Sequence, residues 1–97
     1  MKKCNTLEEL RKEVDAIDEE IVKLIAKRNA YIKQAAKFKT SVDEVKSPER
    51  IEEVMQNARK KAIELGVNPN MIEDLFKIMI DEMVETEIAE FRNGGNF

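Results

Sequence analysis

The longest uninterrupted pattern in the sequence lies in residues 7–39, which contain no Gly and no Pro. Apolar side chains recur there every three or four residues, at Leu7, Leu10, Val14, Ile17, Ile21 and Leu24. This spacing predicts one helix of roughly 33 residues, about 50 Å long. A compact globule of such a chain has a radius of gyration of only about 13 Å. We therefore expect a second copy of the chain to cover the excess apolar surface, most simply in a symmetric homodimer.

Start and stop signals divide the rest of the chain. Helix starts are indicated by the capping box Thr6-Leu7-Glu8-Glu9 and by the pairs Ser47-Pro48 and Asn68-Pro69, while Gly66 is a stop signal. Residues 40–47 are polar and are predicted to form a connection. We expect an all-α fold with a single domain over residues 1–97, in which three helices form an intertwined homodimeric bundle. The predicted helices are about 6–40, 48–65 and 69–92.

The composition excludes several classes of function. The 97 residues include one Cys and no His, which excludes disulfides within the chain, His-based metal sites and Ser-His-Asp catalysis. We expect neither a metal nor a cofactor. A net charge of −3 argues against nucleic-acid binding. No apolar run is long enough for a membrane span or a secretory signal, so we expect no membrane partner. A lone Cys4 suits a reducing compartment, and we expect a cytoplasmic location.

Three cations on the first predicted helix are candidate ligand-binding residues. Arg28 interrupts the apolar row. Its guanidinium group either extends to solvent or pairs with a carboxylate, or else it binds an anionic ligand. Arg11 and Lys39 lie on the neighbouring row, where surface charge is the alternative explanation. Arg28 and Lys39 are about 16 Å apart along a helix, so both can reach one small ligand, whereas Arg11 at about 25 Å from Arg28 must come from another subunit.

Two charged residues on the later helices also stand out. Arg50 lies in the first turn of its helix, where a cation opposes the helix dipole. It either pairs with Glu49 or Glu53, or binds an anion together with the free amides of that turn. Glu87 lies at the inner edge of the third helix and is either exposed or functional. If Glu87 is buried, desolvation should favour its protonated form.

These residues carry a family likeness. The chain resembles the all-α (AroQ-type) chorismate mutase family over nearly its whole length. The likeness rests on five stretches in register, which are Leu10-Arg11-Lys12-Glu13-Val14-Asp15-Ala16-Ile17-Asp18, Leu24-Ile25-Ala26-Lys27-Arg28, Lys37-Phe38-Lys39, Pro48-Glu49-Arg50 and Leu75-Phe76-Lys77-Ile78-Met79-Ile80.

The resemblance implies a role for each candidate residue. Arg28 is similar to the arginine that clamps a substrate carboxylate, and Arg11 to the arginine lent by the second subunit. Lys39 resembles the lysine that hydrogen-bonds the ether oxygen of the breaking bond. Arg50 resembles the arginine that helps to hold the anionic ligand. Glu87 stands where many members have Gln, the second donor to that oxygen.

The resemblance thus implies Lys39, Glu87 and Arg28 as catalytic residues. It implies a substrate-binding set of Arg11, Arg28, Arg50, Lys39, Ile51 and Met83. The implied activity is the rearrangement of chorismate, a dianion, to prephenate. That reaction needs neither a proton transfer nor a covalent intermediate, which agrees with a chain that lacks His.

Two positions depart from the mutase pattern and leave more than one substrate possible. Typical mutases have a Glu after the arginine of the second helix, where it holds the ring hydroxyl of chorismate, but this chain has Ile51. An Asp that is common three residues before that arginine is Ser47 here. An aliphatic residue at position 51 is similar to the isochorismate-pyruvate lyases, which yield salicylate and pyruvate. An amino-substituted chorismate is a third possible substrate, and a non-catalytic helical dimerisation module is the alternative class, although Arg28 is unusual for a coiled-coil seam.

Overall fold

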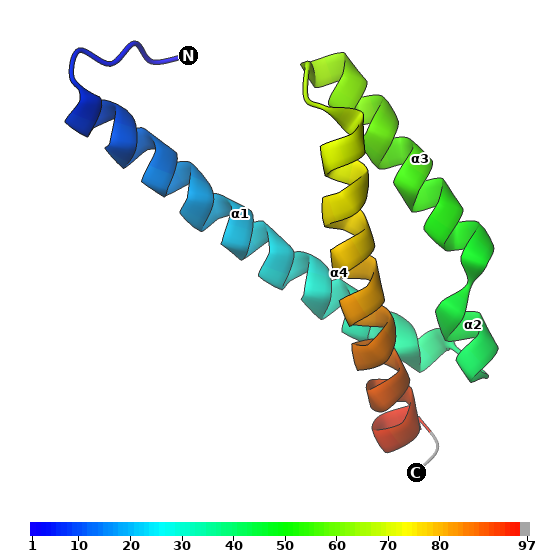
Figure 1. Cartoon of the computed structure of the whole chain (residues 1–97). Coiled ribbons are helices and arrows are strands. Elements are labelled where there is room, and N and C mark those ends of the chain that lie inside the picture. Colours follow the sequence, from blue (N-terminus) through cyan, green and yellow to red (C-terminus); the bar gives the residue numbers. More distant parts are fainter. Residues whose placement is uncertain (96–97) are drawn as a thin grey trace. The chain divides into compact units, whose positions relative to one another are not determined.

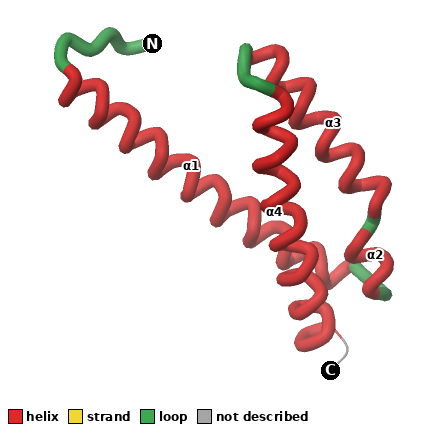
Figure 2. The backbone as a smooth tube through the Cα atoms, in the orientation of Figure 1, coloured by secondary structure: helices red, strands yellow, loops and turns green. Residues whose placement is uncertain are grey.

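A computed structural model describes residues 1–95, and every regular element in that range is helical. The elements are α1 (Leu7–Ala35), the 3₁₀ helix η1 (Ala36–Phe38), α2 (Val42–Lys46), α3 (Pro48–Leu65), α4 (Pro69–Glu90) and the π-helical turn η2 (Phe91–Gly95) (Figures 1 and 2). The all-α class and the three long helices expected from the sequence are confirmed. The chain divides into two units, Met1–Tyr31 and the part from Ile32 onward.

The first unit is the N-terminal part of α1 together with the residues before it. The predicted capping box is confirmed, because the Glu9 N–H donates to Thr6 Oγ1 at 3.1 Å and the Asn5 N–H donates to Glu9 Oε2 at 2.9 Å. The first bond satisfies an N–H group that a helix start would leave without a partner, and the second joins the Glu9 side chain to the residue before the cap. The leading residues are tied to the helix by an ion pair between Lys2 Nζ and Glu13 Oε1 at 2.8 Å.

The apolar row of α1 is exposed along its length. The exposed fractions are 49% for Leu10, 58% for Ile17 and 61% for Leu24. Leu, Ile and Val side chains ordinarily lie in the interior of a protein. This row is therefore an apolar surface that the first unit leaves uncovered.

The α-helical part of the first helix ends at Ala35, so the prediction of a helix to about residue 40 was too long. The Lys39 N–H donates to the Ala36 carbonyl at 3.3 Å, a tighter 3₁₀ bond. The next amide, that of Thr40, donates instead to the Glu44 carboxylate at 2.6 Å. Lys39 is extended, with φ −94° and ψ 142°, so the helical path has ended by this point and the Thr40 N–H finds a side-chain acceptor instead of a helical carbonyl.

Residues 42–46 form the short helix α2, where the sequence predicted a polar connection. Ser41 is its N-cap, and the Glu44 N–H donates to Ser41 Oγ at 3.2 Å. Val45 is only 4% exposed and is the buried residue of this helix, which contacts α4. The helix exists because one capping interaction and one buried side chain are enough to order a single turn.

In the second unit, α3 and α4 form an antiparallel hairpin (Figure 1). Gly66 ends α3 with φ +74°, and the Val67 N–H donates to the Ala62 carbonyl at 2.8 Å, as in a Schellman motif. Asn68 begins α4 as predicted, since the Asn70 N–H donates to Asn68 Oδ1 at 2.9 Å. The predicted stop and the predicted cap are thus both confirmed.

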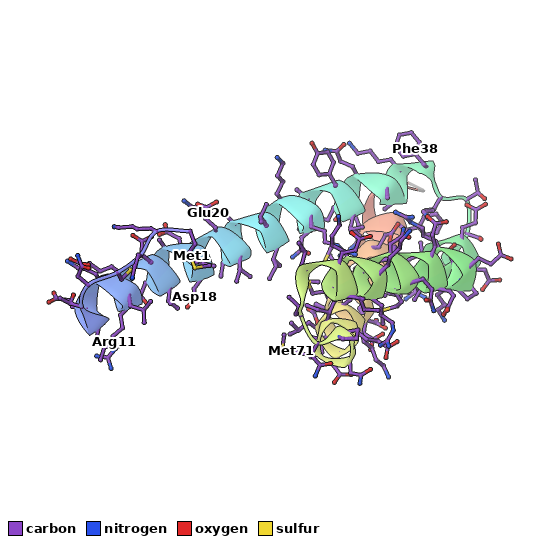
Figure 3. The ribbon with its side chains drawn as sticks, turned by 90° about the horizontal axis from the view of Figure 1, so that it is seen from above. Met1, Arg11, Asp18, Glu20, Phe38 and Met71 are labelled. Atoms are coloured by element: carbon purple, nitrogen blue, oxygen red, sulfur yellow. The ribbon has the colours of Figure 1, made fainter. Side chains whose placement is uncertain are left out.

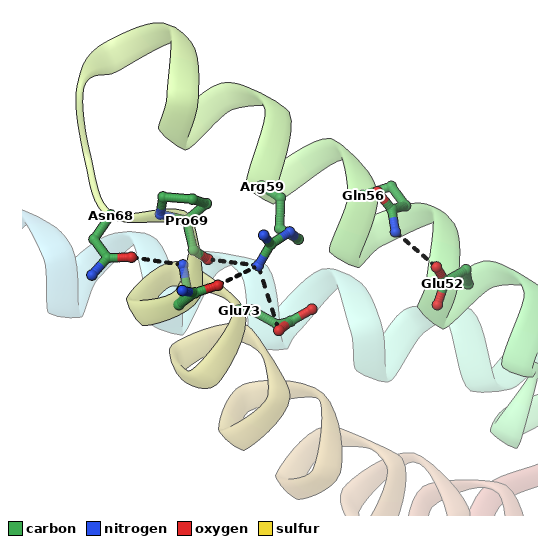
Figure 4. Close-up of polar contacts among 7 residues, drawn as sticks. Glu52, Gln56, Arg59, Asn68, Pro69 and Glu73 are labelled. Atoms are coloured by element: carbon green, nitrogen blue, oxygen red, sulfur yellow. Dashed lines mark hydrogen bonds and ion pairs between the residues drawn. The ribbon is translucent and has the colours of Figure 1, made fainter.

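Arg59 fastens the end of α3 to the start of α4. Its Nη1 donates to the Pro69 carbonyl at 3.3 Å and to Asn70 Oδ1 at 3.1 Å, and it lies 3.5 Å from Glu73 Oε2 (Figure 4). The Arg59 side chain is only 28% exposed, so these contacts are better shielded than ordinary surface ion pairs. Arg59 therefore stabilises the hairpin and is not a residue left for a ligand.

The core of the second unit is small. Its buried apolar side chains come from η1, α2, α3 and above all α4, and they are Ala36, Val45, Ala62, Ile80, Met83 and Ile88. Pro48 is the first residue of α3 as predicted, but the Ser47 side chain makes no capping bond. Its N–H instead donates to the Asp43 carbonyl at 3.1 Å, so Ser47 ends α2 while it begins α3. Among residues 1–95, no helix is long and apolar enough to cross a membrane.

Candidate active site

Lys39 and Glu87 are brought together in the second unit. Lys39 directly follows η1, and η1 contacts α4, which carries Glu87. The two side chains, both within residues 1–95, form no hydrogen bond or ion pair with each other, but the charge of the Lys39 ammonium acts on the Glu87 carboxyl and offsets part of the increase in its pKa that burial causes. These are the two residues that the sequence analysis expected beside a reacting ether oxygen.

Glu87 is buried, with an exposed fraction of 6%. Its Oε1 has no hydrogen-bond partner within the part of the chain that the structure describes. Burial raises the pKa of Glu87 above its ordinary value of 4.5, and the Lys39 charge offsets only part of that increase. A carboxyl group in this setting favours its protonated form, in which it can donate a hydrogen bond.

Lys39 is half-buried and already makes one contact. Its Nζ donates to the backbone carbonyl of Glu44 at 3.2 Å. An ammonium group has three N–H donors, so two of them are left for Glu87 or for a ligand. Because α1 ends at Ala35, Lys39 does not belong to the α-helical row on which the sequence analysis placed it.

Arg50 and Ile51 are neighbours in the first turn of α3. Arg50 is exposed and forms an ion pair with Glu53, one of the two alternatives that the sequence left open. An exposed pair of this kind contributes little stability, so the guanidinium can exchange Glu53 for an anionic ligand at small cost. Ile51 is half-buried and has no polar atom in its side chain with which to hold a hydroxyl group.

The remaining predicted site residues lie on α1 and α4. Arg11 is exposed near the beginning of α1 (Figure 3). Arg28 is half-buried on the same helix. Met83 is 5% exposed and lies one helical turn before Glu87 on α4, so it belongs to the core as well as to the surroundings of that carboxyl. The roles of these residues toward a ligand remain predictions.

An open hollow between α3 and α4 is not suited to an anionic ligand. It is lined by Ile51, Met55 and Ile80, by one lysine, Lys77, and by the carboxylates of Glu52, Glu73, Asp74 and Asp81. Such an excess of negative charge repels a dianion. Among residues 1–95, no three His, Cys, Asp or Glu side chains are grouped to hold a metal ion. The surroundings of Lys39 and Glu87, which are not part of this lining, are therefore the better candidate site.

Sequence reasoning missed Ser41 and Glu44, which close the turn that follows Lys39 in the structure. The signal was present, because Ser41-Val42-Asp43-Glu44 has the same spacing as the capping box that was recognised at Thr6. It was overlooked because only a five-residue helix follows it, too short to show an apolar period.

Comparison with known proteins agrees with these observations. Residues 10–88 match the family described as chorismate mutase type II. The isochorismate pyruvate lyase of Pseudomonas aeruginosa is 30% identical over 89 residues, which cover 92% of this chain and 88% of that protein. The chorismate mutase of Methanocaldococcus jannaschii is 37% identical over 76 residues, 77% of each chain.

A third relative is longer. The T-protein of Haemophilus influenzae is 32% identical over 82 residues, which are 84% of this chain but 22% of that protein. The family match spans most of the chain, and it includes Arg11, Arg28, Lys39, Arg50 and Glu87. The resemblance drawn from the sequence is therefore confirmed: the chain belongs to the chorismate mutase type II family.

Proposed function

We propose that this chain is a chorismate mutase, which rearranges chorismate to prephenate. The observation that carries the proposal is the Lys39 ammonium beside the buried Glu87 carboxyl, within a chain of this family. A charged donor and a protonated carboxyl can together stabilise the negative charge that develops on an ether oxygen. The family resemblance implies roles for Lys39 and Glu87, and this pair has the chemistry that the reaction needs.

The rearrangement breaks the ether C–O bond of chorismate and forms a C–C bond within the same molecule. No proton is exchanged with the protein, so the site has to bind the substrate, hold it in a folded conformation and stabilise its transition state. In the proposed site, Arg28, Arg50 and Arg11 hold the two carboxylates of the dianion. Lys39 and protonated Glu87 donate hydrogen bonds to the ether oxygen.

We further propose that the active unit is a homodimer in which Arg11 reaches the site of the other subunit, each chain forming one domain. The exposed row at Leu10, Ile17 and Leu24 supports this arrangement, since a long apolar stripe on a helix favours association. Arg11 is exposed and lies next to that stripe in the sequence, so a second copy that covers the stripe would also approach Arg11.

An isochorismate pyruvate lyase activity is the second candidate, because Ile51 has no polar group at the position where typical mutases have Glu. The Pseudomonas aeruginosa relative is named for that activity. The lyase reaction breaks the corresponding ether bond and moves a hydrogen within the substrate, so it also needs no protein base. The same cations would hold either dianion, and the ring hydroxyl distinguishes the two substrates.

The test is to give the purified chain chorismate and isochorismate separately and to follow prephenate in one case and salicylate with pyruvate in the other. In the favoured activity, Lys39→Ala should lower kcat by about 10²- to 10³-fold, as expected for the loss of one donor to a developing oxyanion. Lys37→Ala is the matched control, because Lys37 is an exposed lysine two residues away. Turnover of neither substrate would favour an amino-substituted chorismate or a non-catalytic dimerisation module.

A further inference from the structure

The ammonium group of Lys39 is held by α2, the helix that the sequence did not predict. Lys39 Nζ donates to the Glu44 carbonyl at 3.2 Å, and this carbonyl lies in the middle of α2. A lysine side chain has four rotatable carbon–carbon bonds and loses considerable entropy when it is fixed in one position. The contact with α2 supplies part of that restraint before any ligand arrives.

The Glu44 carbonyl is able to accept this bond because α2 ends at Lys46, before the residue that would be its helical partner. In an α-helix, the carbonyl of one residue accepts from the N–H of the residue four positions later. For Glu44 that residue is Pro48, which has no N–H. The Glu44 carbonyl therefore lies in the last turn of α2 without a helical partner, and Lys39 donates to it.

The turn between Lys39 and α2 is closed by two side chains. The Glu44 carboxylate accepts from the Thr40 N–H at 2.6 Å, and Ser41 Oγ accepts from the Glu44 N–H at 3.2 Å. The buried side chain of Val45 keeps α2 against α4, the helix of Glu87. The position of the Lys39 ammonium relative to Glu87 thus depends on a turn that Glu44 closes.

We propose that Glu44 is a positioning residue for Lys39, whose carboxylate closes the Lys39–Glu44 turn and so keeps the Lys39 ammonium beside Glu87. The inference rests on the proposed function, in which Lys39 donates to the ether oxygen. Glu44 itself does not touch the substrate. Its hydrogen bond from the Thr40 amide, together with the Lys39 charge, lowers the pKa of Glu44, so the side chain is a carboxylate at neutral pH.

A double-mutant cycle tests whether Glu44 acts through Lys39. In the wild-type background, Glu44→Ala should lower kcat by about tenfold or more while KM changes little, because a misplaced donor costs transition-state stabilisation. In a Lys39→Ala background, the same change should cost less than about twofold, since coupled residues are not additive. Equal losses in both backgrounds would overturn the proposal.

Asn68→Ala is the matched control for the loss of a cap. Asn68 caps α4 with its side chain, as Glu44 and Ser41 close the start of α2, but it lies at the other end of α4 from Glu87. Asn68→Ala should lower thermal stability, and its effect on kcat should be the same in the wild-type and in the Lys39→Ala background. Glu44→Gln keeps an oxygen that can accept from the Thr40 N–H, so it should retain most of the activity that Glu44→Ala loses.

An NMR measurement needs no turnover and separates this proposal from the proposed function. In Glu44→Ala, the Thr40 amide signal and the Lys39 Cε signal should both move, the latter towards that of the exposed Lys37. Unchanged Thr40 and Lys39 signals would refute the positioning role whatever the activity. If these signals move but Lys39→Ala keeps full activity with both substrates, the turn is real, and the roles given to Lys39 and to Glu44 in catalysis are wrong.

Discussion

At the scale of single residues, Glu87 is the side chain whose behaviour depends most on its surroundings. From the sequence it was only a carboxylate at the inner edge of a helix. In the structure it is 6% exposed, and the positive charge of Lys39 only partly compensates for its burial. Its protonation state therefore links the acidity of the solution to the chemistry of the site.

Activity should fall as the pH rises, because Glu87 donates a hydrogen bond only while it is protonated. Burial raises its pKa above 4.5, so the protonated form persists to a higher pH than for an exposed Glu and is lost as the pH rises through the raised value. Glu87→Gln, whose amide donates at every pH, should flatten the profile of kcat. Glu90→Gln, an exposed residue on the same helix, is the control, and an unchanged profile in Glu87→Gln would contradict the role.

The residue at position 51 should decide between the two substrates. Ile51→Glu supplies the carboxylate that typical family members use for the ring hydroxyl of chorismate. We expect the ratio of mutase to lyase kcat/KM to rise by about tenfold or more, as for one hydrogen bond to a charged group. Ile51→Gln has a side chain of the same size as Ile51→Glu but without its charge, and it should raise this ratio less. If Ile51→Glu leaves the ratio unchanged, position 51 does not belong to the part of the site that binds the ring.

At the scale of elements, two motifs of the same spacing had different outcomes. The box at Thr6–Glu9 precedes a long apolar period and was recognised, whereas the box at Ser41–Glu44 precedes a single turn and was not. Local hydrogen bonds can start a helix of any length, but an apolar period is visible only over several turns. Short helices beside a site are therefore the elements that sequence patterns detect least well.

The end of α3 depends on the backbone conformation of Gly66. Its φ is +74°, and a Cβ built there would meet nothing within 4 Å. Gly66→Ala should therefore destabilise the fold by about 1 kcal/mol through the left-handed conformation alone. Gly66→Asn should cost less because Asn tolerates this conformation better, and thermal or urea unfolding measures both variants. Equal stability of Gly66→Ala and wild type would contradict the assignment.

At the scale of the whole molecule, the exposed apolar row of α1 has to be explained. Ile17 is 58% exposed and Leu24 is 61% exposed, on a helix that is otherwise rich in charge. Helices in proteins gain most of their stability from the packing of an apolar face. A second copy of the chain, related by symmetry, is the simplest partner for such a face.

Ile17→Glu should weaken the dimer without unfolding the chain, because it places a charge in the proposed interface at a position that is exposed in the single chain. Sedimentation or light scattering over a range of concentrations measures the shift towards monomer. Lys23→Ala changes the net charge by the same amount on the opposite side of α1, where Lys23 pairs with Glu19 and Glu20, and should leave the dimer unchanged. A dimer of equal strength in both variants would exclude this row from the interface.

Sharing of Arg11 between subunits predicts complementation. Arg11→Ala and Arg28→Ala should each be nearly inactive. When the two chains are unfolded and refolded together, half of the dimers contain both, and each of these has one intact site. Activity should therefore recover to about a quarter of the wild-type value. Each variant refolded alone is the control, and a mixture that stays inactive would contradict the shared site.

The sequence by itself determined the all-α class, the capped starts at Thr6 and Asn68, the stop at Gly66 and the family of the chain. The helical class, the caps and the stop follow from local hydrogen bonds, backbone conformation and periodicity, which act between residues near one another in the chain, whereas the family follows from the sequence motifs that the chain shares with it. Only the tertiary structure decided that Glu87 is buried and that the charge of Lys39 acts on its carboxyl. The burial of a side chain and the effect of a nearby charge depend on segments that are distant in the chain, so no local sequence pattern predicts them.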